Sequence, residues 1–121
     1  MDKQVRLPGP DHPIAITPFG GRVVVKAHGQ VIADTRNALI LREASYPPVY
    51  YIPRGDADMA QLARTTHQTY CSYKGEASYF SLPGAENAVW SYEAPHPAMA
   101  AIKDHLAFYA NRVDGIEASG A

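Results

Sequence analysis

Residues 22–35, RVVVKAHGQVIADT, decide the fold of this chain. In the first half of the stretch the side chains alternate between two faces, with Val23, Val25 and Ala27 on one and Arg22, Val24 and Lys26 on the other. A period of two is typical of a β-strand. His28-Gly29 then favours a tight turn, and residues 31–35, VIADT, are expected to form the returning strand. The stretch therefore predicts an antiparallel β-hairpin.

Short apolar runs separated by turn residues continue on both sides of this hairpin. The strand-like pattern begins at Ile14, and further strands are expected over residues 38–43, 49–52, 69–73, 77–82, 88–92 and 106–110. Residues 22–43 are expected to pair as a three-stranded meander. Most connections are too short for the crossover helices that join parallel strands.

Two brief helices are expected between the strands. Asp56 can cap a helix over about residues 57–65, because a carboxylate accepts hydrogen bonds from the first backbone N–H groups of a helix. Pro97 suits the first turn of a second helix that reaches about His105. The sequence therefore predicts a mainly β fold, namely a single curled antiparallel sheet with two short α-helices.

The length of 121 residues is typical of a single domain. Pro8, Gly9 and Pro10 oppose regular structure near the N-terminus. We therefore expect a flexible arm over residues 1–12, one β-rich domain over residues 13–117 and a frayed tail over residues 118–121.

The composition argues against several classes of partner. The net charge is −1 and the basic residues are scattered singly, whereas nucleic-acid binding depends on clustered cations that neutralise phosphates. No apolar window approaches the roughly 18 residues of a membrane span. The single cysteine, Cys71, allows neither an internal disulfide nor a multi-cysteine zinc site. We expect a cytoplasmic protein that binds no nucleic acid or membrane and holds no metal ion or cofactor.

Four strings in the second half carry a resemblance to a known family: VYYIPRGD (49–56), TYCSYKGEASYF (69–80), AVWSYEAP (88–95) and LAFYANRVDGIE (106–117). Over roughly residues 18–117 the chain resembles a bacterial family called domain of unknown function 427, which also carries a nucleotidyltransferase-like label. The string from Cys71 to Tyr79 is its most specific part. Ser72 departs from the family pattern, which usually has proline after the cysteine.

The resemblance implies a twisted-sheet fold similar to that of methionine-sulfoxide reductase B and the Mss4-type zinc proteins. Those proteins hold zinc with two Cys-x-x-Cys pairs, and this chain has neither pair. Nucleotidyl transfer would need clustered carboxylates that hold Mg²⁺ against a triphosphate. Asp56 and Asp58 are better explained by the start of a helix. We therefore expect the fold without zinc and without nucleotidyl transfer.

Aromatic residues crowd the second half of the chain, and tyrosines buried there need partners for their hydroxyl groups. A tyrosine-rich core and a ligand cleft with cations at its rim both explain this pattern. Cys71 is explained by burial or by reactivity, Lys74 by a turn or by a place at the rim, and His96 by a solvated loop or by acid–base chemistry. The residues expected to form a ligand site are Arg42, Tyr50, Arg54, Cys71, Tyr73, Lys74, Tyr79, Trp90, Tyr92 and His96.

Two functions follow from these residues. The first is the binding of a small polar or anionic molecule between the hairpin of residues 71–79 and the strand of residues 90–92. The alternative is a non-catalytic protein-interaction module that uses exposed tyrosines and an open sheet edge. Whether the domain catalyses a reaction, and whether it is a monomer or a homodimer, stay open at this point.

Overall fold

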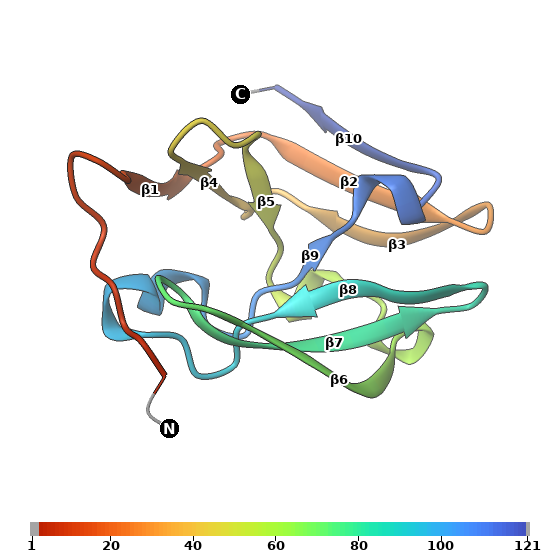
Figure 1. Cartoon of the computed structure of the whole chain (residues 1–121). Helices are drawn as coiled ribbons and strands as arrows, with labels where there is room; N and C mark the ends of the chain where they lie inside the picture. The colour runs from red at the N-terminus through yellow and green to blue at the C-terminus, as the bar shows by residue number, and fades with distance from the viewer. Residues whose placement is uncertain (1–2, 121) are drawn as a thin grey trace.

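The computed structural model describes residues 3–120, and most of its regular structure is β-strand (Figure 1). The strands are β1 (Ile14–Pro18), β2 (Arg22–Ala27), β3 (Gln30–Thr35), β4 (Leu39–Glu43), β5 (Val49–Tyr51), β6 (Ala63–Cys71), β7 (Gly75–Leu82), β8 (Ala85–Ser91), β9 (Ala107–Phe108) and β10 (Gly115–Ser119). Short 3-10 helices lie between them: η1 (Arg54–Asp56), η2 (Met59–Gln61), η3 (Pro97–Ile102) and η4 (Ala110–Arg112).

The strands form three antiparallel sheets, with the orders β1-β4-β5, β10-β2-β3 and β6-β7-β8-β9. Figure 1 shows the first two sheets in the upper half of the molecule and β6, β7 and β8 in the lower half. The prediction of one curled sheet is not confirmed. β4 pairs with β1 and β5 instead of β3, so the expected meander of residues 22–43 breaks after β3. The N–H of Phe19 donates to the carbonyl of Ala38 at 2.9 Å, which holds the beginning of β4 beside β1.

The hairpin of β2 and β3 is present as the sequence predicts. Val25 pairs with Ala33, and the register shifts by one residue just after this pair. His28 and Gly29 both have positive φ, 52° and 70°, as the tight turns of hairpins require. Val23 and Val25 are fully buried, so the predicted apolar face is the face that packs.

The predicted α-helix over residues 57–65 is wrong. Only the single turn η2 forms, capped by Asp58 in place of Asp56, and β6 begins at Ala63. The segment 63–71 is rich in threonine, which packs well in strands, and it pairs along β7. The second expected helix is the 3-10 helix η3, which ends at Ile102. No helix within residues 3–120 is long and apolar enough to cross a membrane.

Both ends of the described chain contact the domain. In the N-terminal arm, the N–H of Arg6 donates to the carbonyl of Ser72 at 2.9 Å. At the other end, β10 pairs with β2 from Gly115 opposite Lys26 to Ser119 opposite Arg22. The expected frayed tail is therefore part of a sheet as far as Ser119.

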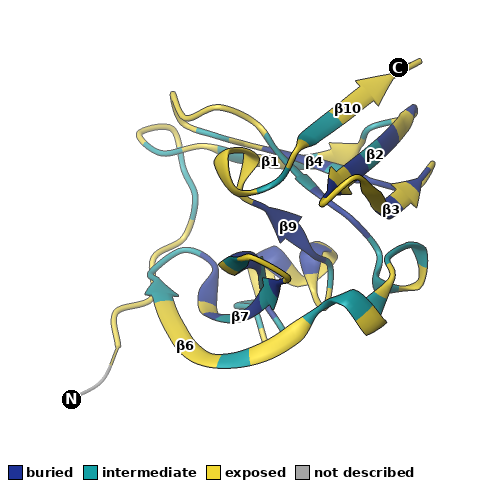
Figure 2. Ribbon diagram, turned by 90° about the vertical axis from the view of Figure 1, so that its right-hand side faces the viewer, coloured by how far each residue is buried: buried dark blue, intermediate teal, exposed yellow. Residues whose placement is uncertain are grey.

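The core consists of two adjoining clusters of buried side chains. The first lies between the β2–β3 hairpin and the inner faces of β7 and β8, and it includes Val23, Val25, Ile32, Phe80 and Val89. The second lies between β4–β5 and the other half of the molecule, and it includes Leu41, Tyr51, Tyr79, Tyr92 and Ile102. Figure 2 shows β9 buried between the two halves. Ile52 and Leu106 exchange two backbone hydrogen bonds of 2.8 Å and so join β5 to the chain leading into β9.

Candidate functional site

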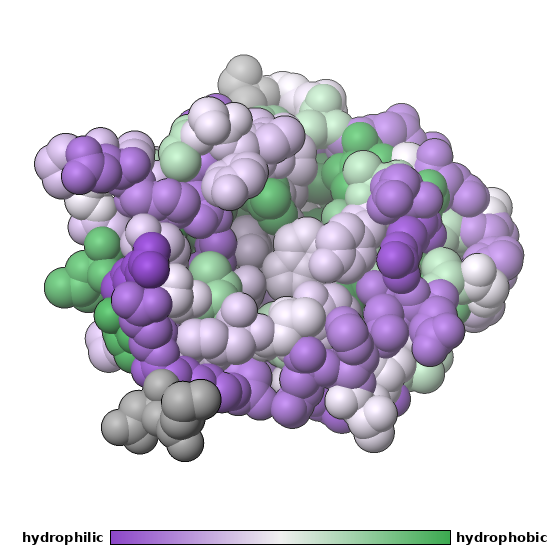
Figure 3. Space-filling model, viewed as in Figure 1, coloured by the Kyte–Doolittle hydropathy of each residue, from purple (hydrophilic) through white to green (hydrophobic). Residues whose placement is uncertain are grey.

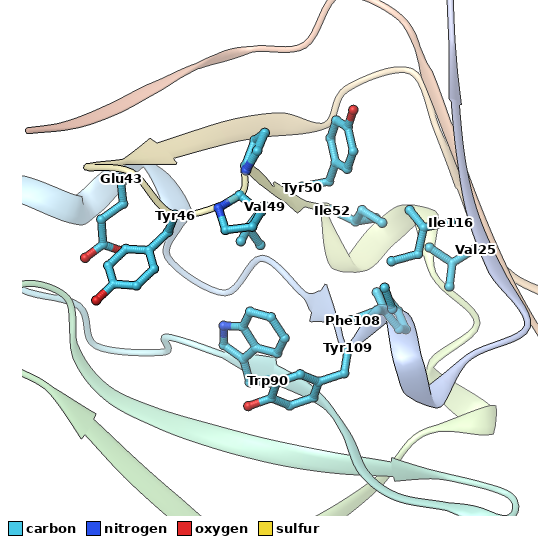
Figure 4. A pocket seen from close by; sticks show the side chains of 13 residues that line it. Val25, Glu43, Tyr46, Val49, Tyr50, Ile52, Trp90, Phe108, Tyr109 and Ile116 are labelled. Carbon is cyan, nitrogen blue, oxygen red and sulfur yellow. The ribbon is translucent and has the colours of Figure 1, made fainter.

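A cleft of about 860 Å³ lies between the β4–β5 segment and the β8–η4 segment (Figure 4). Its lining comes from several elements: Val25, Glu43, Tyr46, Pro47, Pro48, Val49, Tyr50, Ile52, Trp90, Phe108, Tyr109, Ala110 and Ile116. The surface is hollowed between the two halves of the molecule, and pale and green residues lie in the hollow (Figure 3). The cleft is therefore apolar over most of its wall.

One wall of the cleft is the loop between β4 and β5. Pro47 and Pro48 lack backbone N–H groups and cannot extend either strand. Ala44, at the start of the loop, has a φ of 46° and turns the chain away from β4. Tyr46 is 64% exposed and lies at the rim. The two prolines thus keep the chain out of the sheet and provide a stiff apolar wall.

The opposite wall carries two aromatic rings. Trp90 lies on β8 between its register partners, Tyr79 on β7 and Ala107 on β9. Tyr109 follows β9, and its N–H donates to the carbonyl of Ala88 at 2.9 Å. The ring centroids of Trp90 and Tyr109 are 4.5 Å apart. The pairing of β8 with β9 therefore places the two rings side by side.

The polar atoms of this wall are paired behind the cleft. The indole N–H of Trp90 donates to the hydroxyl of Tyr51 at 3.3 Å, and burial raises the pKa of Tyr51 far above its ordinary value. Burial, followed by the contact with the Tyr79 hydroxyl, raises the pKa of Tyr109 to about 12. Burial also raises the pKa of Tyr92. These phenols therefore stay protonated at neutral pH.

One end of the cleft carries a charge. Glu43, the last residue of β4, is the one charged residue lining the cleft among residues 3–120. One of its oxygens accepts a hydrogen bond from the Lys74 ammonium, and Oε2 lies 2.7 Å from Nε2 of His12. Burial raises the pKa of Glu43, but the hydrogen bonds from Lys74 and His12 outweigh it and the net pKa is lowered. Glu43 is therefore a carboxylate at neutral pH.

Lys74 reaches Glu43 because of the turn between β6 and β7. Gly75 has a φ of 113°, and a Cβ atom there would lie 3.4 Å from the backbone nitrogen of His96. That nitrogen donates to the Lys74 carbonyl at 2.9 Å. The turn therefore packs against residues 94–96, and the positive φ of Gly75 is one that only glycine adopts without strain. The Lys74 side chain points inward and is 10% exposed.

The structure brings five of the predicted site residues together. Tyr79 and Tyr92 are buried in the second core cluster, and Cys71 and Trp90 pack against it. Lys74 joins them, since its Nζ lies 3.8 Å from Cys71 Sγ. Of these five residues only Trp90 lines the cleft. The others form the packed layer behind it.

The remaining predicted residues lie elsewhere or at the margin. Tyr50 lines the cleft and packs edge-on against Phe19. Tyr73 stacks on His12 at 4.1 Å, outside the cleft lining. Arg42 is exposed on β4.

Arg54 and His96 take part in other contacts. Arg54 donates to Glu93 at 2.7 Å and to Ser91 at 3.0 Å. The Nε2 atom of His96 lies 3.1 Å from the Tyr70 hydroxyl. The sequence suggested that Arg42, Arg54 and Lys74 could stand at the rim of one ligand cleft. None of the three is among the residues that line the cleft.

Residues of the site that were absent from the predicted set include Glu43, His12, Tyr46 and Tyr109. The place of Glu43 at the end of β4 is visible in the sequence, but its partners Lys74 and His12 are each 31 residues away. Tyr46 beside Pro47-Pro48 is a local signal for an aromatic ring on a stiff loop, and that signal could have been used.

The described part of the chain offers no arrangement for a metal ion. Within residues 3–120 no group of three or more His, Cys, Asp and Glu side chains is placed to hold one. Asp56 accepts from the Thr35 hydroxyl at 2.7 Å, and Asp58 accepts from the N–H of Ala60 at 3.3 Å. Both carboxylates thus have local structural partners.

Comparison with known proteins identifies a family and no activity. A family model described as a domain of unknown function (DUF427), with a nucleotidyltransferase-like label, matches residues 15–119. No curated protein matches the sequence. The proposal for its function therefore depends on the geometry of the cleft.

Proposed function

The chain belongs to the family described as a domain of unknown function (DUF427), and from that premise we propose that it binds a small molecule in the cleft beside Trp90 and Tyr109. The observation that carries the proposal is the cleft itself, with a volume of about 860 Å³ and a largely apolar lining. Ligand sites in proteins are concave, mostly apolar and equipped with few polar groups. The cleft has these properties.

The lining favours a ligand with a mostly apolar, aromatic body. The cations that would attract an anion lie elsewhere: Arg54 pairs with Glu93, Arg42 is absent from the lining, and Lys74 lies behind Glu43. The earlier expectation of an anionic ligand therefore loses its support. The proposed ligand carries its polar group at the end where Glu43 lies.

Binding is favoured over covalent catalysis. No serine, cysteine, lysine or histidine within residues 3–120 is among the residues that line the cleft. Among residues 3–120, Glu43 is the one carboxylic acid in the lining, and its lowered pKa makes it a weak base. The proposal is therefore a binding site without an activated nucleophile.

A protein-interaction surface is the second candidate. β6 is the outer strand of its sheet, and most of its residues are exposed, so its free edge offers backbone groups to another strand. Exposed large apolar residues give this candidate less support because they come from separate segments. Val5 and Leu7 lie in the N-terminal arm, Val31 lies in the β2–β3 hairpin, and Tyr46 and Tyr109 flank the cleft.

Two further expectations also stand as proposals. The short antiparallel strands and the lack of Cys-x-x-Cys pairs support a zinc-free likeness to the methionine-sulfoxide reductase B and Mss4-type fold. Such a likeness concerns the fold and not the reaction, and a single cysteine offers no second thiol for sulfoxide reduction. The lone Cys71 supports the reducing cytoplasm as the location.

An NMR titration tests the binding proposal. The sequence has one tryptophan, so the indole N–H of Trp90 gives a single, assignable signal from the wall of the cleft. We expect small bicyclic aromatic probes to shift this signal in a saturable way. Ala110 is exposed and lines the cleft, and Ala101 is also exposed but lies outside the lining.

The matched pair of variants locates the binding. Ala110→Phe should fill the cleft and abolish the shift, and Ala101→Phe should leave it unchanged. If no aromatic probe perturbs Trp90, or if Ala110→Phe binds as well as the parent protein, the proposal is wrong.

A further inference from the structure

The charge at the polar end of the cleft is compensated from behind. Glu43 faces the cleft, whereas Lys74 contacts the same carboxylate from outside the lining. Glu43 would attract an incoming cation, but Lys74 would repel it, and the reverse holds for an incoming anion. A neutral group that donates a hydrogen bond is repelled by neither residue and forms a charge-assisted hydrogen bond with Glu43. The charge pattern therefore favours a neutral ligand.

Glu43 still has room to accept a hydrogen bond. An ionised carboxylate has about four lone-pair sites on its two oxygens. Lys74 occupies one site on Oε1, and His12 lies against Oε2. Figure 4 shows Tyr46 and Glu43 at the same end of the cleft, and the ring centroid of Tyr46 lies 6.5 Å from that of His12. Because Glu43 can only accept, the matching group of the ligand must be a donor.

The rest of the cleft suits a flat ring system. Trp90 and Tyr109 lie across from Val49 and the Pro47-Pro48 loop (Figure 4). The indole N–H of Trp90 is already donated to Tyr51, so the face of the indole is what this residue offers to a ligand. Aromatic rings pack on such faces by offset stacking or edge-to-face contact.

From these contacts we infer that the cleft takes a neutral, planar aromatic molecule whose N–H or O–H group donates a hydrogen bond to Glu43. The inference rests on the proposed function and specifies its ligand class. It differs from the polar or anionic ligand that the sequence suggested.

Four matched probes test the ligand class on the unmodified protein: 2-naphthol, 2-methoxynaphthalene, 2-naphthoate and 2-naphthylmethylammonium. They share one ring system and differ in whether the polar group is a neutral donor, a neutral acceptor, an anion or a cation. The affinity of each is measured from the shift of the Trp90 indole signal. We expect 2-naphthol to bind about tenfold more tightly than each of the other three, the usual scale for a hydrogen bond to a charged group.

A variant then locates the donor contact. Glu43→Leu removes both acceptor oxygens, and we expect it to bind 2-naphthol no better than 2-methoxynaphthalene. If this variant does not fold, a nuclear Overhauser contact between the Glu43 side chain and bound 2-naphthol in the parent protein replaces it, and the lack of that contact overturns the inference.

The outcomes separate the two proposals. Tightest binding of the naphthoate or of the ammonium probe, or equal affinities of 2-naphthol and its methyl ether, overturns the ligand class while leaving a binding cleft. Failure of all four probes to shift the Trp90 signal overturns the proposed function together with the inference.

Discussion

Lys74 donates a hydrogen bond to Glu43 across the junction between two sheets, and both side chains are largely buried, at 10% and 14% exposure. Lys74 lies in the turn between β6 and β7, and Glu43 ends β4. His12 completes the group from the N-terminal arm. This ion pair therefore connects both halves of the domain to the polar end of the cleft.

Replacing Lys74 should strongly destabilise the domain. In Lys74→Met the buried carboxylate of Glu43 loses its main partner, and removal of one partner of a buried pair costs about 3 kcal/mol or more. We expect urea denaturation to show this loss. The double variant Lys74→Met/Glu43→Leu should recover part of it, because it buries no uncompensated charge.

An exposed lysine provides the control for this prediction. Lys103 is exposed at the end of η3, and Lys103→Met should change the free energy of unfolding by about 0.5 kcal/mol or less. Equal effects of Lys74→Met and Lys103→Met would contradict the structural role of the Lys74–Glu43 pair.

The stability of the domain should fall in acid because of Glu93. Hydrogen bonds from Arg64, and then from Arg54, outweigh burial and lower the pKa of Glu93 to about 2 from its ordinary value of 4.5. The folded state thus takes up this proton less readily than the unfolded state. The stabilisation is present above the unfolded-state pKa and is lost as pH falls from about 5 towards 2. Solvent screening limits it to about 1–2 kcal/mol.

Glu93→Gln isolates this contribution. Urea unfolding at a series of pH values should show the variant less stable than the parent at neutral pH, with the gap closing as pH falls towards 2. Other carboxylates titrate in both proteins, so they cancel in the difference. A gap that stays constant with pH would assign the lost stability to something other than the charge of Glu93.

The turn that carries Lys74 should be intolerant of a side chain at Gly75. Alanine there would have to adopt a φ of 113°, a backbone conformation that L side chains rarely adopt, and we expect Gly75→Ala to cost about 1–3 kcal/mol by thermal and urea denaturation. Gly55 has open space around its Cβ position and no positive φ. Gly55→Ala should therefore change stability by less than about 1 kcal/mol; equal costs at the two glycines would rule out strain at Gly75.

Deletion of residues 115–121 should weaken the domain and promote self-association. The deletion removes β10, which covers one edge of β2, and Ile116, which packs against the first core cluster. We expect a loss of about 2 kcal/mol or more and light scattering from paired β2 edges. Deletion of residues 120–121 alone leaves the pairing of β10 with β2 intact, so this shorter deletion should match the full chain in stability and light scattering. Unchanged light scattering after the longer deletion would show that β10 does not protect the edge of β2.

Local patterns identified many of the strands. The alternation of Val23 and Val25, the His28-Gly29 turn and the short apolar runs after Ile14 are properties of neighbouring residues, and the structure has strands and turns there. The prediction of a helix over residues 57–65 was wrong because it also relied on the local pattern alone. Its apolar spacing suits a helix, but only the single turn η2 forms, and pairing with β7 makes a strand of the segment from Ala63 onward.

The sequence by itself determined that this chain is mainly β and that the turn of the β2–β3 hairpin lies at His28-Gly29. It also indicated that Cys71, Tyr79, Trp90 and Tyr92 share one part of the structure. The tertiary structure alone decided which strands pair, because hydrogen-bond partners such as β10 and β2 come from distant segments whose local patterns are equivalent. It also decided which charges meet. Glu43 joins Lys74 and Arg54 joins Glu93 because the sheets pack in one particular way, and no spacing along the chain encodes that packing.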